Sequence, residues 1–144
     1  MRSFFDTNIL VYMFDHDAPV KKAQAQELLQ KETEAGRALL STQVLQEFYV
    51  TVTRKLKLPL QAEVAEEVVH NLAVLPLVEI SGSHILGAIS RSRRWQVSFW
   101  DALILEAAIN GGATVLYSED LQHGQVIEEV RIENPFSAAA GCAE

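Results

Sequence analysis

The first residues of the chain constrain its fold more than any other stretch. Phe4 and Phe5 lead directly into Asp6, Thr7 and Asn8, and an apolar run follows at residues 9–13. Strands buried on both faces appear as continuous apolar runs, and Thr and Asn are residue types that begin helices. This order predicts a short buried strand, a tight polar turn and a helix. Asp6 then lies at the carboxyl end of a strand, where open α/β sheets bind their ligands.

The alternation of strand and helix continues along the chain. Four more apolar segments predict strands, at residues 38–40, 77–80, 113–117 and 126–132. The stretches between them predict helices, at residues 20–34, 43–55, 61–72, 81–94 and 97–109. Strands that alternate with helices form a mostly parallel sheet covered on both faces. We therefore predict an α/β fold, a three-layer α/β/α sandwich around a mostly parallel central sheet.

Length and composition fit one domain. The chain has 144 residues, of which 49% are hydrophobic and 22% charged, enough to bury roughly two thirds of its unfolded surface. We expect a single domain over residues 1–136 and a disordered Ala-rich tail over residues 137–144. No apolar stretch approaches the ~20 residues that span a bilayer, and the N-terminus lacks the pattern of a signal peptide. With Cys142 as the one cysteine, a cytoplasmic location is expected.

The charge of the chain narrows the classes of function. A net charge of −7 argues against a generally basic nucleic-acid binder, because phosphate contacts need local Lys and Arg. An acidic site can still meet phosphate through bound cations. Arg91, Arg93 and Arg94 form a basic cluster just before the helix at residues 97–109, and one interpretation is that they contact nucleic-acid phosphates. The alternative, a solvated helix end, stays open.

Four carboxylates are expected at one edge of the sheet. Asp6 and Asp120 follow strands, whereas Glu47 and Asp101 lie in the first turns of helices. Each of the two helical acids can simply support a helix dipole, although a buried Asp101 costs several kcal/mol unless it is paired or binds a metal. Together the four acids repel one another, and divalent cations relieve that repulsion. An all-oxygen set suits one or two Mg²⁺ or Mn²⁺ ions rather than Zn²⁺, and two such ions support phosphodiester cleavage.

The chain resembles the PIN domain family over nearly its whole length. Four segments carry the resemblance in order: Phe5-Asp6-Thr7-Asn8, Ser41-Thr42 followed by Glu47, Ser98-Phe99-Trp100-Asp101-Ala102, and Leu116-Tyr117-Ser118-Glu119-Asp120-Leu121. The resemblance implies a metal-dependent ribonuclease, most often the VapC-like toxin of a bacterial type II toxin–antitoxin pair. It implies catalytic and metal-binding roles for Asp6, Glu47, Asp101 and Asp120, with Thr7, Asn8, Ser98 and Ser118 in support. Glu119 adjoins Asp120, and the family pattern favours Asp120 as the residue that faces the metal.

Partners and competing functions complete the expectations. RNA is the expected substrate, and a small antitoxin that blocks the site is an expected partner. Apolar helices predict a homodimer in which Phe48, Tyr49 and Val52 contact the partner's helix. A non-catalytic PIN-like RNA-binding or scaffold protein is the main alternative. A receiver-type phosphoacceptor would need a second acid near the first strand and a Lys after a late strand, and neither is evident in this sequence.

Overall fold

The computed structural model describes residues 1–137. Its strands are β1 (Arg2–Phe5), β2 (Ala38–Ser41), β3 (Leu77–Val78), β4 (Ala113–Tyr117), β5 (Val126–Ile127) and β6 (Val130–Glu133). Its helices are α1 (Thr7–Tyr12), α2 (Pro19–Glu34), α3 (Thr42–Arg54), α4 (Ala62–Leu72), α5 (Gly82–Trp95) and α6 (Phe99–Asn110). The expectation of a disordered tail concerns residues 137–144, of which 138–144 lie outside the described residues.

The strands form one mixed sheet in the order β3-β2-β1-β4-β6-β5. All neighbouring pairs are parallel except β5 and β6, which are antiparallel. The first strand, β1, therefore lies inside the sheet between β2 and β4, with Ser3 opposite Ala38 and Phe5 opposite Tyr117. The predicted mostly parallel sheet is confirmed.

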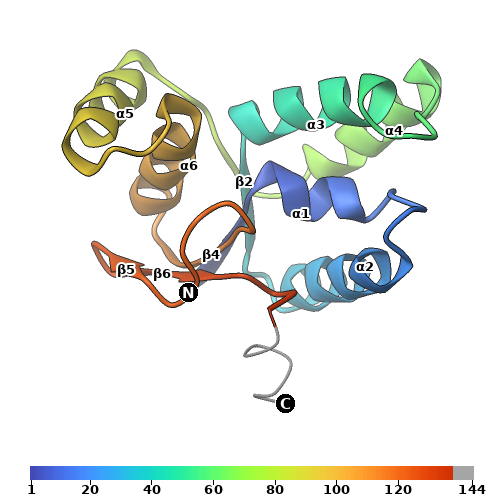
Figure 1. The fold of residues 1–144 in the computed structure, drawn as a ribbon, viewed down its shortest axis with the longest axis horizontal. Helices are drawn as coiled ribbons and strands as arrows, with labels where there is room; N and C mark the ends of the chain where they lie inside the picture. The colour runs from blue at the N-terminus through green and yellow to red at the C-terminus, as the bar shows by residue number, and fades with distance from the viewer. Residues whose placement is uncertain (138–144) are drawn as a thin grey trace.

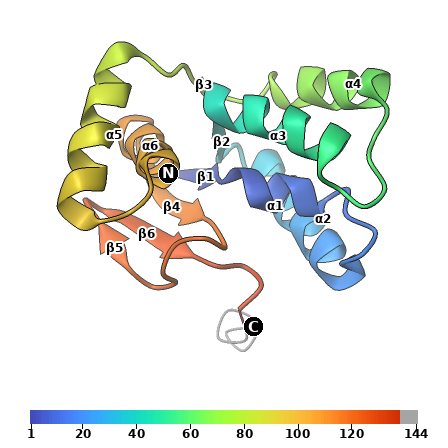
Figure 2. The same ribbon diagram turned by 45° about the horizontal axis from the view of Figure 1, so that its top comes forward.

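Helices cover the strands from both sides. Figure 1 shows α5 and α6 on one side of β1 and β2, with α1 to α4 on the other, and the turned view in Figure 2 agrees. Adjacent residues Phe4 and Phe5 of β1 point to opposite faces, and both are fully buried, as expected of a strand covered on both faces. The predicted α/β architecture is confirmed. No helix within residues 1–137 combines the length and apolar character needed to span a bilayer.

The predicted fifth strand at residues 126–132 is instead a hairpin. Strands β5 and β6 are joined by Glu128 and Glu129, whose φ angles are 45° and 74°. Positive φ at both central residues is typical of the tight turn that matches the right-handed twist of paired strands. The sequence did not reveal this turn because such positions usually carry Asn or Gly.

Two further boundaries differ from the predictions. The side chain of Asp6, rather than that of Thr7 or Asn8, caps α1 by accepting a hydrogen bond from the Thr7 backbone N–H. The strand expected at residues 77–80 ends at Val78, because its neighbour β2 ends at Ser41 where α3 begins.

The predicted dimer contact through Phe48 and Val52 is wrong. Both side chains are fully buried in the hydrophobic core of the described chain, because this face of α3 packs against α1 and α4. Tyr49, between them in sequence, is exposed and is the one of the three that a partner can contact.

Candidate active site

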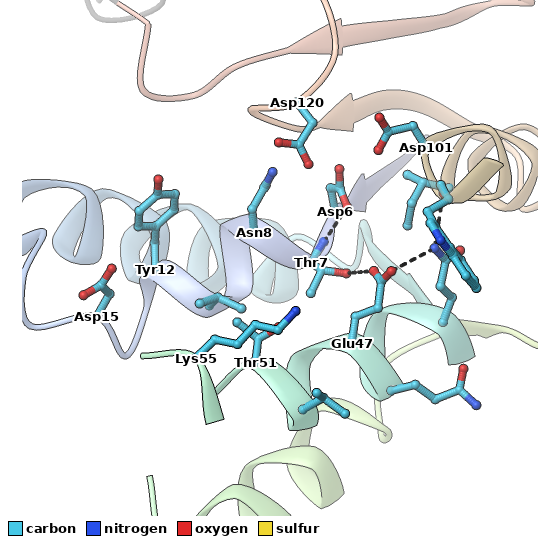
Figure 3. Close-up of a pocket in the computed structure, with 16 residues that line it drawn as sticks. Asp6, Thr7, Asn8, Tyr12, Asp15, Glu47, Thr51, Lys55, Asp101 and Asp120 are labelled. Atoms are coloured by element: carbon cyan, nitrogen blue, oxygen red, sulfur yellow. Dashed lines mark hydrogen bonds between the residues drawn. The ribbon is translucent and has the colours of Figure 1, made fainter. Parts of the chain in front are cut away.

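The carboxyl edge of the sheet opens into a cavity of about 790 Å³. Its walls come from the end of β1, from α1, α3 and α6, and from the loop that follows β4 (Figure 3). All four acids expected at one edge of the sheet line this cavity: Asp6, Glu47, Asp101 and Asp120. The fold thus brings together side chains separated by up to 114 residues, through the meeting of parallel strand ends.

Asp6 is the most restrained of the four. Its side chain is buried, with 4% of its surface exposed. Oδ1 accepts a hydrogen bond from the Thr7 backbone N–H at 2.7 Å, and Oδ2 accepts one from the Ser118 hydroxyl at 2.7 Å. The Asp6 backbone N–H donates to the carbonyl of Tyr117 at 2.9 Å. Strand β1 and the end of β4 therefore hold this carboxylate in one orientation.

Burial raises the pKa of Asp6 to about 7. The hydrogen bonds from Ser118 and Thr7 oppose this shift, and the negative charges of Asp120 and Asp101 add to it. Burial also raises the pKa of Asp120, with a contribution from the charge of Asp101. The site therefore disfavours the accumulation of negative charge, which is the condition that a bound cation relieves.

Asp6, Asp101 and Asp120 form what we call the aspartate cluster. Each offers one carboxylate oxygen, and the three oxygens lie within 4.8 Å of one another. Figure 3 shows the three side chains converging from β1, α6 and the loop after β4. The residues that line the cavity include no His or Cys, so the donor set suits a hard divalent cation such as Mg²⁺ or Mn²⁺ and does not suit Zn²⁺.

The neighbouring acids Glu119 and Asp120 point in different directions. Asp120 lines the cavity, and its backbone N–H donates to the Ser118 hydroxyl at 3.1 Å. Glu119 instead accepts a hydrogen bond from the Tyr12 hydroxyl at 2.7 Å and forms an ion pair with Lys21. Asp120, and not Glu119, therefore belongs to the aspartate cluster.

Glu47 lies beside the aspartate cluster rather than in it. Its Oε1 accepts a hydrogen bond from the Thr7 hydroxyl at 2.7 Å, and its Oε2 accepts one from Gln43 Nε2 at 3.3 Å. Gln43 also donates to the backbone carbonyl of Trp100 at 3.2 Å. These contacts join the starts of α1, α3 and α6 around the cavity, as the dashed lines in Figure 3 show in part.

The predicted supporting residues occupy distinct positions. The Ser98 hydroxyl caps α6 by accepting from the Asp101 N–H at 3.1 Å, which fixes the helix turn that carries this aspartate. Asn8 lines the cavity and points toward Asp120 in Figure 3. Its amide lies close enough to lower the pKa of Asp120, yet its buried Oδ1 and Nδ2 make no hydrogen bond of normal geometry within the described chain.

Lys55 and Trp100 also line the cavity, and neither was among the predicted site residues. Glu47, Thr51 and Lys55 recur at intervals of four on α3 and its C-cap, so helical spacing was the signal that could have found Lys55. Figure 3 shows its ammonium end turned toward Thr7 and Glu47. Among the residues that line the cavity, Lys55 is the one Lys or Arg.

The three arginines assigned to RNA do not line the cavity. Arg91 is engaged in two ion pairs, through Nε to Glu106 at 2.8 Å and through Nη2 to Glu128 at 2.5 Å. It therefore ties α5 to α6 and to the β5–β6 turn. Arg93 and Arg94 lie exposed in the last turn of α5.

Fold and cavity together define the class of protein. It is an α/β protein with a carboxylate-lined cavity at the carboxyl edge of a mostly parallel sheet. The family follows from the sequence itself. The profile of the PIN domain matches residues 3–128, so the chain belongs to the PIN domain family and the resemblance found in its motifs is confirmed. No curated protein sequence matches the chain significantly.

Solved structures that share the fold include a toxin and toxin–antitoxin complexes. The Mycobacterium tuberculosis VapC20 toxin, described as cleaving the sarcin–ricin loop, has a TM-score of 0.66 at 15% identity, covering 82% of this chain and 89% of that one. A toxin–antitoxin complex from Klebsiella pneumoniae has a TM-score of 0.65 at 19% identity, covering 89% and 94%. VapBC2 from Rickettsia felis, bound to a DNA fragment from its promoter, has a TM-score of 0.64 at 17% identity, covering 92% and 98%.

Proposed function

We propose that this protein is an endoribonuclease that hydrolyses RNA phosphodiester bonds with the help of Mg²⁺ or Mn²⁺. The observation that carries the proposal is the aspartate cluster, whose three oxygens lie within 4.8 Å of one another in an open cavity. Membership of the PIN domain family and the likeness to a toxin that cleaves the sarcin–ricin loop support the same chemistry. In this proposal residues 1–136 form a single nuclease domain that acts in the cytoplasm.

In this proposal, some residues of the cavity bind the metal ions and others position those ligands. Asp6, Asp101 and Asp120 would hold one ion, and Glu47 would complete the set and help to hold a second. When bound, such ions lower the pKa of water and neutralise charge that develops on a phosphate. Thr7 and Ser118 keep the carboxylate oxygens of Glu47 and Asp6 in place by donating hydrogen bonds at 2.7 Å, so the ligands need no reorganisation before the reaction.

Substrate phosphates need positive charge beyond the cations. Lys55 lies in the cavity wall, and we assign it to a phosphate next to the one that is cleaved. Arg93 and Arg94 are exposed and remain candidates for more distant phosphates, whereas Arg91 already forms ion pairs with Glu106 and Glu128.

The test is divalent-metal-dependent cleavage of mixed RNA oligonucleotides. Wild-type protein should cleave with Mg²⁺ or Mn²⁺ and stop in EDTA, and Asp6→Asn and Asp101→Asn should lose most of the activity. Glu63→Gln is the matched control, because Glu63 is an exposed acid of α4 that does not line the cavity. Full cleavage in EDTA, or by Asp101→Asn, would contradict the proposal. RNA binding without cleavage by folded wild type would favour the non-catalytic alternative.

We further propose that the protein is the toxin of a type II pair, with a small antitoxin and a homodimeric state. The structural neighbours that are toxin–antitoxin complexes support this assignment. Tyr49 and Val50 leave apolar surface exposed on α3, where a second chain can pack. A neighbouring-gene product that neither binds nor inhibits the protein would contradict the antitoxin assignment, and a strict monomer in light scattering at high micromolar concentration would contradict the dimer.

A further inference from the structure

Trp100 leaves its large aromatic side chain open to solvent in the wall of the cavity. Its exposed fraction is 60%, although it directly precedes Asp101 in a helix with six buried residues. Trp is highly buried on average in folded proteins, because its ring carries a large apolar surface. An exposed Trp in a cavity wall is therefore a candidate for ligand contact.

The Trp100 segment is held in position before any ligand arrives. Its backbone carbonyl accepts a hydrogen bond from Gln43 Nε2 at 3.2 Å. Its ring packs edge-on against Phe99, with ring centroids 5.1 Å apart and an interplanar angle of 75°. The Ser98 hydroxyl caps the helix turn that carries Trp100 and Asp101. A pre-positioned aromatic side chain loses little entropy when a ligand binds to it.

We propose that Trp100 is a stacking platform for one base of single-stranded RNA, next to the phosphodiester that is cleaved. The inference rests on the proposed ribonuclease function and adds a residue that contacts a base of the substrate. Every nucleobase has a π-face that can stack on an aromatic side chain. Bases in a duplex are already stacked and paired, so the platform accepts unpaired nucleotides in loops and single strands.

The position of Trp100 favours a nucleotide over a protein partner. It is joined by one peptide bond to a residue of the aspartate cluster, and both line the same cavity. A nucleotide whose phosphate lies at the cluster therefore carries its base into the region of Trp100. Val50 and Gln46 of α3 also line this cavity and offer an apolar and a polar contact for the bound nucleotide.

Trp95 provides a matched control within the same chain. It is the other of the two tryptophans and is 39% exposed at the end of α5. The Arg91 guanidinium lies 5.9 Å from the centroid of its ring, and Trp95 does not line the cavity. Substitution of Trp95 therefore changes an exposed tryptophan without touching the proposed platform.

The experiment measures RNA binding separately from cleavage. A Trp95→Phe protein, in which Trp100 is the sole tryptophan, is titrated with short single-stranded RNA in Ca²⁺, and gels verify that the RNA stays intact. The anisotropy of labelled RNA reports binding, and tryptophan emission reports stacking. We expect quenching at saturation, and a loss of affinity of roughly 5- to 150-fold for Trp100→Leu. Trp100→Phe should retain most of the affinity, and Trp95→Leu should bind within about twofold of wild type.

Specific results would overturn the inference. Unchanged emission at saturating RNA, or Trp100→Leu binding RNA as tightly as wild type, contradicts the platform. So does equal affinity for a blunt duplex of the same length. If Trp100→Leu binds RNA normally but loses a basic protein partner, the platform belongs to that partner instead.

Cleavage by wild type separates this inference from the proposed function. Normal cleavage together with normal RNA affinity in Trp100→Leu contradicts the stacking role of Trp100 and supports the ribonuclease function. RNA binding that depends on Trp100, without any metal-dependent cleavage, supports the stacking role of Trp100 and contradicts the ribonuclease function. Absence of saturable RNA binding by wild type contradicts both.

Discussion

The hydroxyl of Thr7 donates a hydrogen bond to Oε1 of Glu47 over 2.7 Å. Thr7 begins α1 directly after Asp6, so this contact joins the turn after β1 to the middle of α3. It also holds Glu47 beside the aspartate cluster, which does not include Glu47. The four acids therefore do not form one equivalent set, and their substitutions should have separable effects.

The first prediction separates Glu47 from the aspartate cluster. Glu47→Gln should bind the first Mn²⁺ ion within about threefold of wild type, whereas Asp101→Asn should weaken it by about tenfold or more because a ligand is lost. Both variants should lose most RNA cleavage. Calorimetric titration with Mn²⁺ measures the first effect and a cleavage assay the second. Equal losses of Mn²⁺ affinity would show that Glu47 is an equal member of the cluster.

The second prediction concerns the stability of the metal-free protein. The pKa of Asp6 is raised from 3.8 to about 7 in the folded state, so between these values the folded protein binds more protons than the unfolded chain. Its stability therefore falls as pH rises through this range, and the penalty is complete above it. Asp6→Asn removes the penalty and keeps a capping side chain, so it should stabilise the protein by roughly 1–3 kcal/mol at about pH 8.

Urea unfolding in EDTA measures this change. At about pH 3 the penalty is absent, because Asp6 is then protonated in both the folded and the unfolded state, and Asp6→Asn should give no gain. A gain of the same size at both pH values would show that the ionisation of Asp6 is not its cause.

The third prediction is that metal affinity depends on pH through the same group. A cation must displace the proton of Asp6, whose pKa is about 7. Mn²⁺ affinity should therefore fall about tenfold between pH 8 and pH 6. The calorimetric enthalpy at about pH 6 should vary with the ionisation enthalpy of the buffer, because protons are released on binding. Affinity that is constant over this range would contradict the prediction.

The fourth prediction concerns Ser118, which is fully buried between two acids. Its hydroxyl donates to Asp6 and accepts from the Asp120 N–H, and its hydrogen bond lowers the pKa of Asp6. Ser118→Ala should raise that pKa further, so the pH midpoint of cleavage should move upward. It should also cost about 1–2 kcal/mol of stability, because the Asp120 N–H loses its partner. Ser118→Thr retains the hydroxyl and should keep the wild-type midpoint, and an unchanged midpoint in Ser118→Ala would contradict this role.

The fifth prediction separates Arg91 from the other arginines of its cluster. Arg91→Gln leaves Glu106 without its ion-pair partner in a mostly buried position, and should cost about 2–4 kcal/mol of stability. The double change of Arg93 and Arg94 to Gln should alter stability by less than about 0.5 kcal/mol, because both side chains are exposed.

Thermal unfolding measures the stability of both proteins. The slope of RNA affinity against salt concentration then decides whether Arg93 and Arg94 contact phosphate. If the double variant has the same slope as wild type, Arg93 and Arg94 do not contact phosphate and are solvated surface residues.

The local sequence was sufficient for the framework of the site. The apolar run into Asp6 predicts a buried strand, and the Ser98 cap predicts the helix turn that carries Asp101, because strand burial and helix capping are set by residues close in sequence. The expectation that distant acids meet at one edge also needed only the strand and helix alternation, since parallel connections bring the carboxyl ends of strands together.

The tertiary structure decided what each side chain contacts. Glu119 turns toward Lys21 and Tyr12 while Asp120 enters the cavity, and Arg91 pairs with Glu128 across the β5–β6 turn. Phe48 is buried, although the sequence placed it at a dimer contact.

These outcomes share one physical reason. Helical spacing shows which residues share a face of a helix, but it does not show whether that face meets the core, a cavity or solvent. Lys55 and Trp100 became part of the site because α3 and α6 border the same cavity, and these helices are adjacent only in the folded chain. The sequence by itself determined which acids the sheet edge collects, and long-range packing determined how they are oriented and what surrounds them.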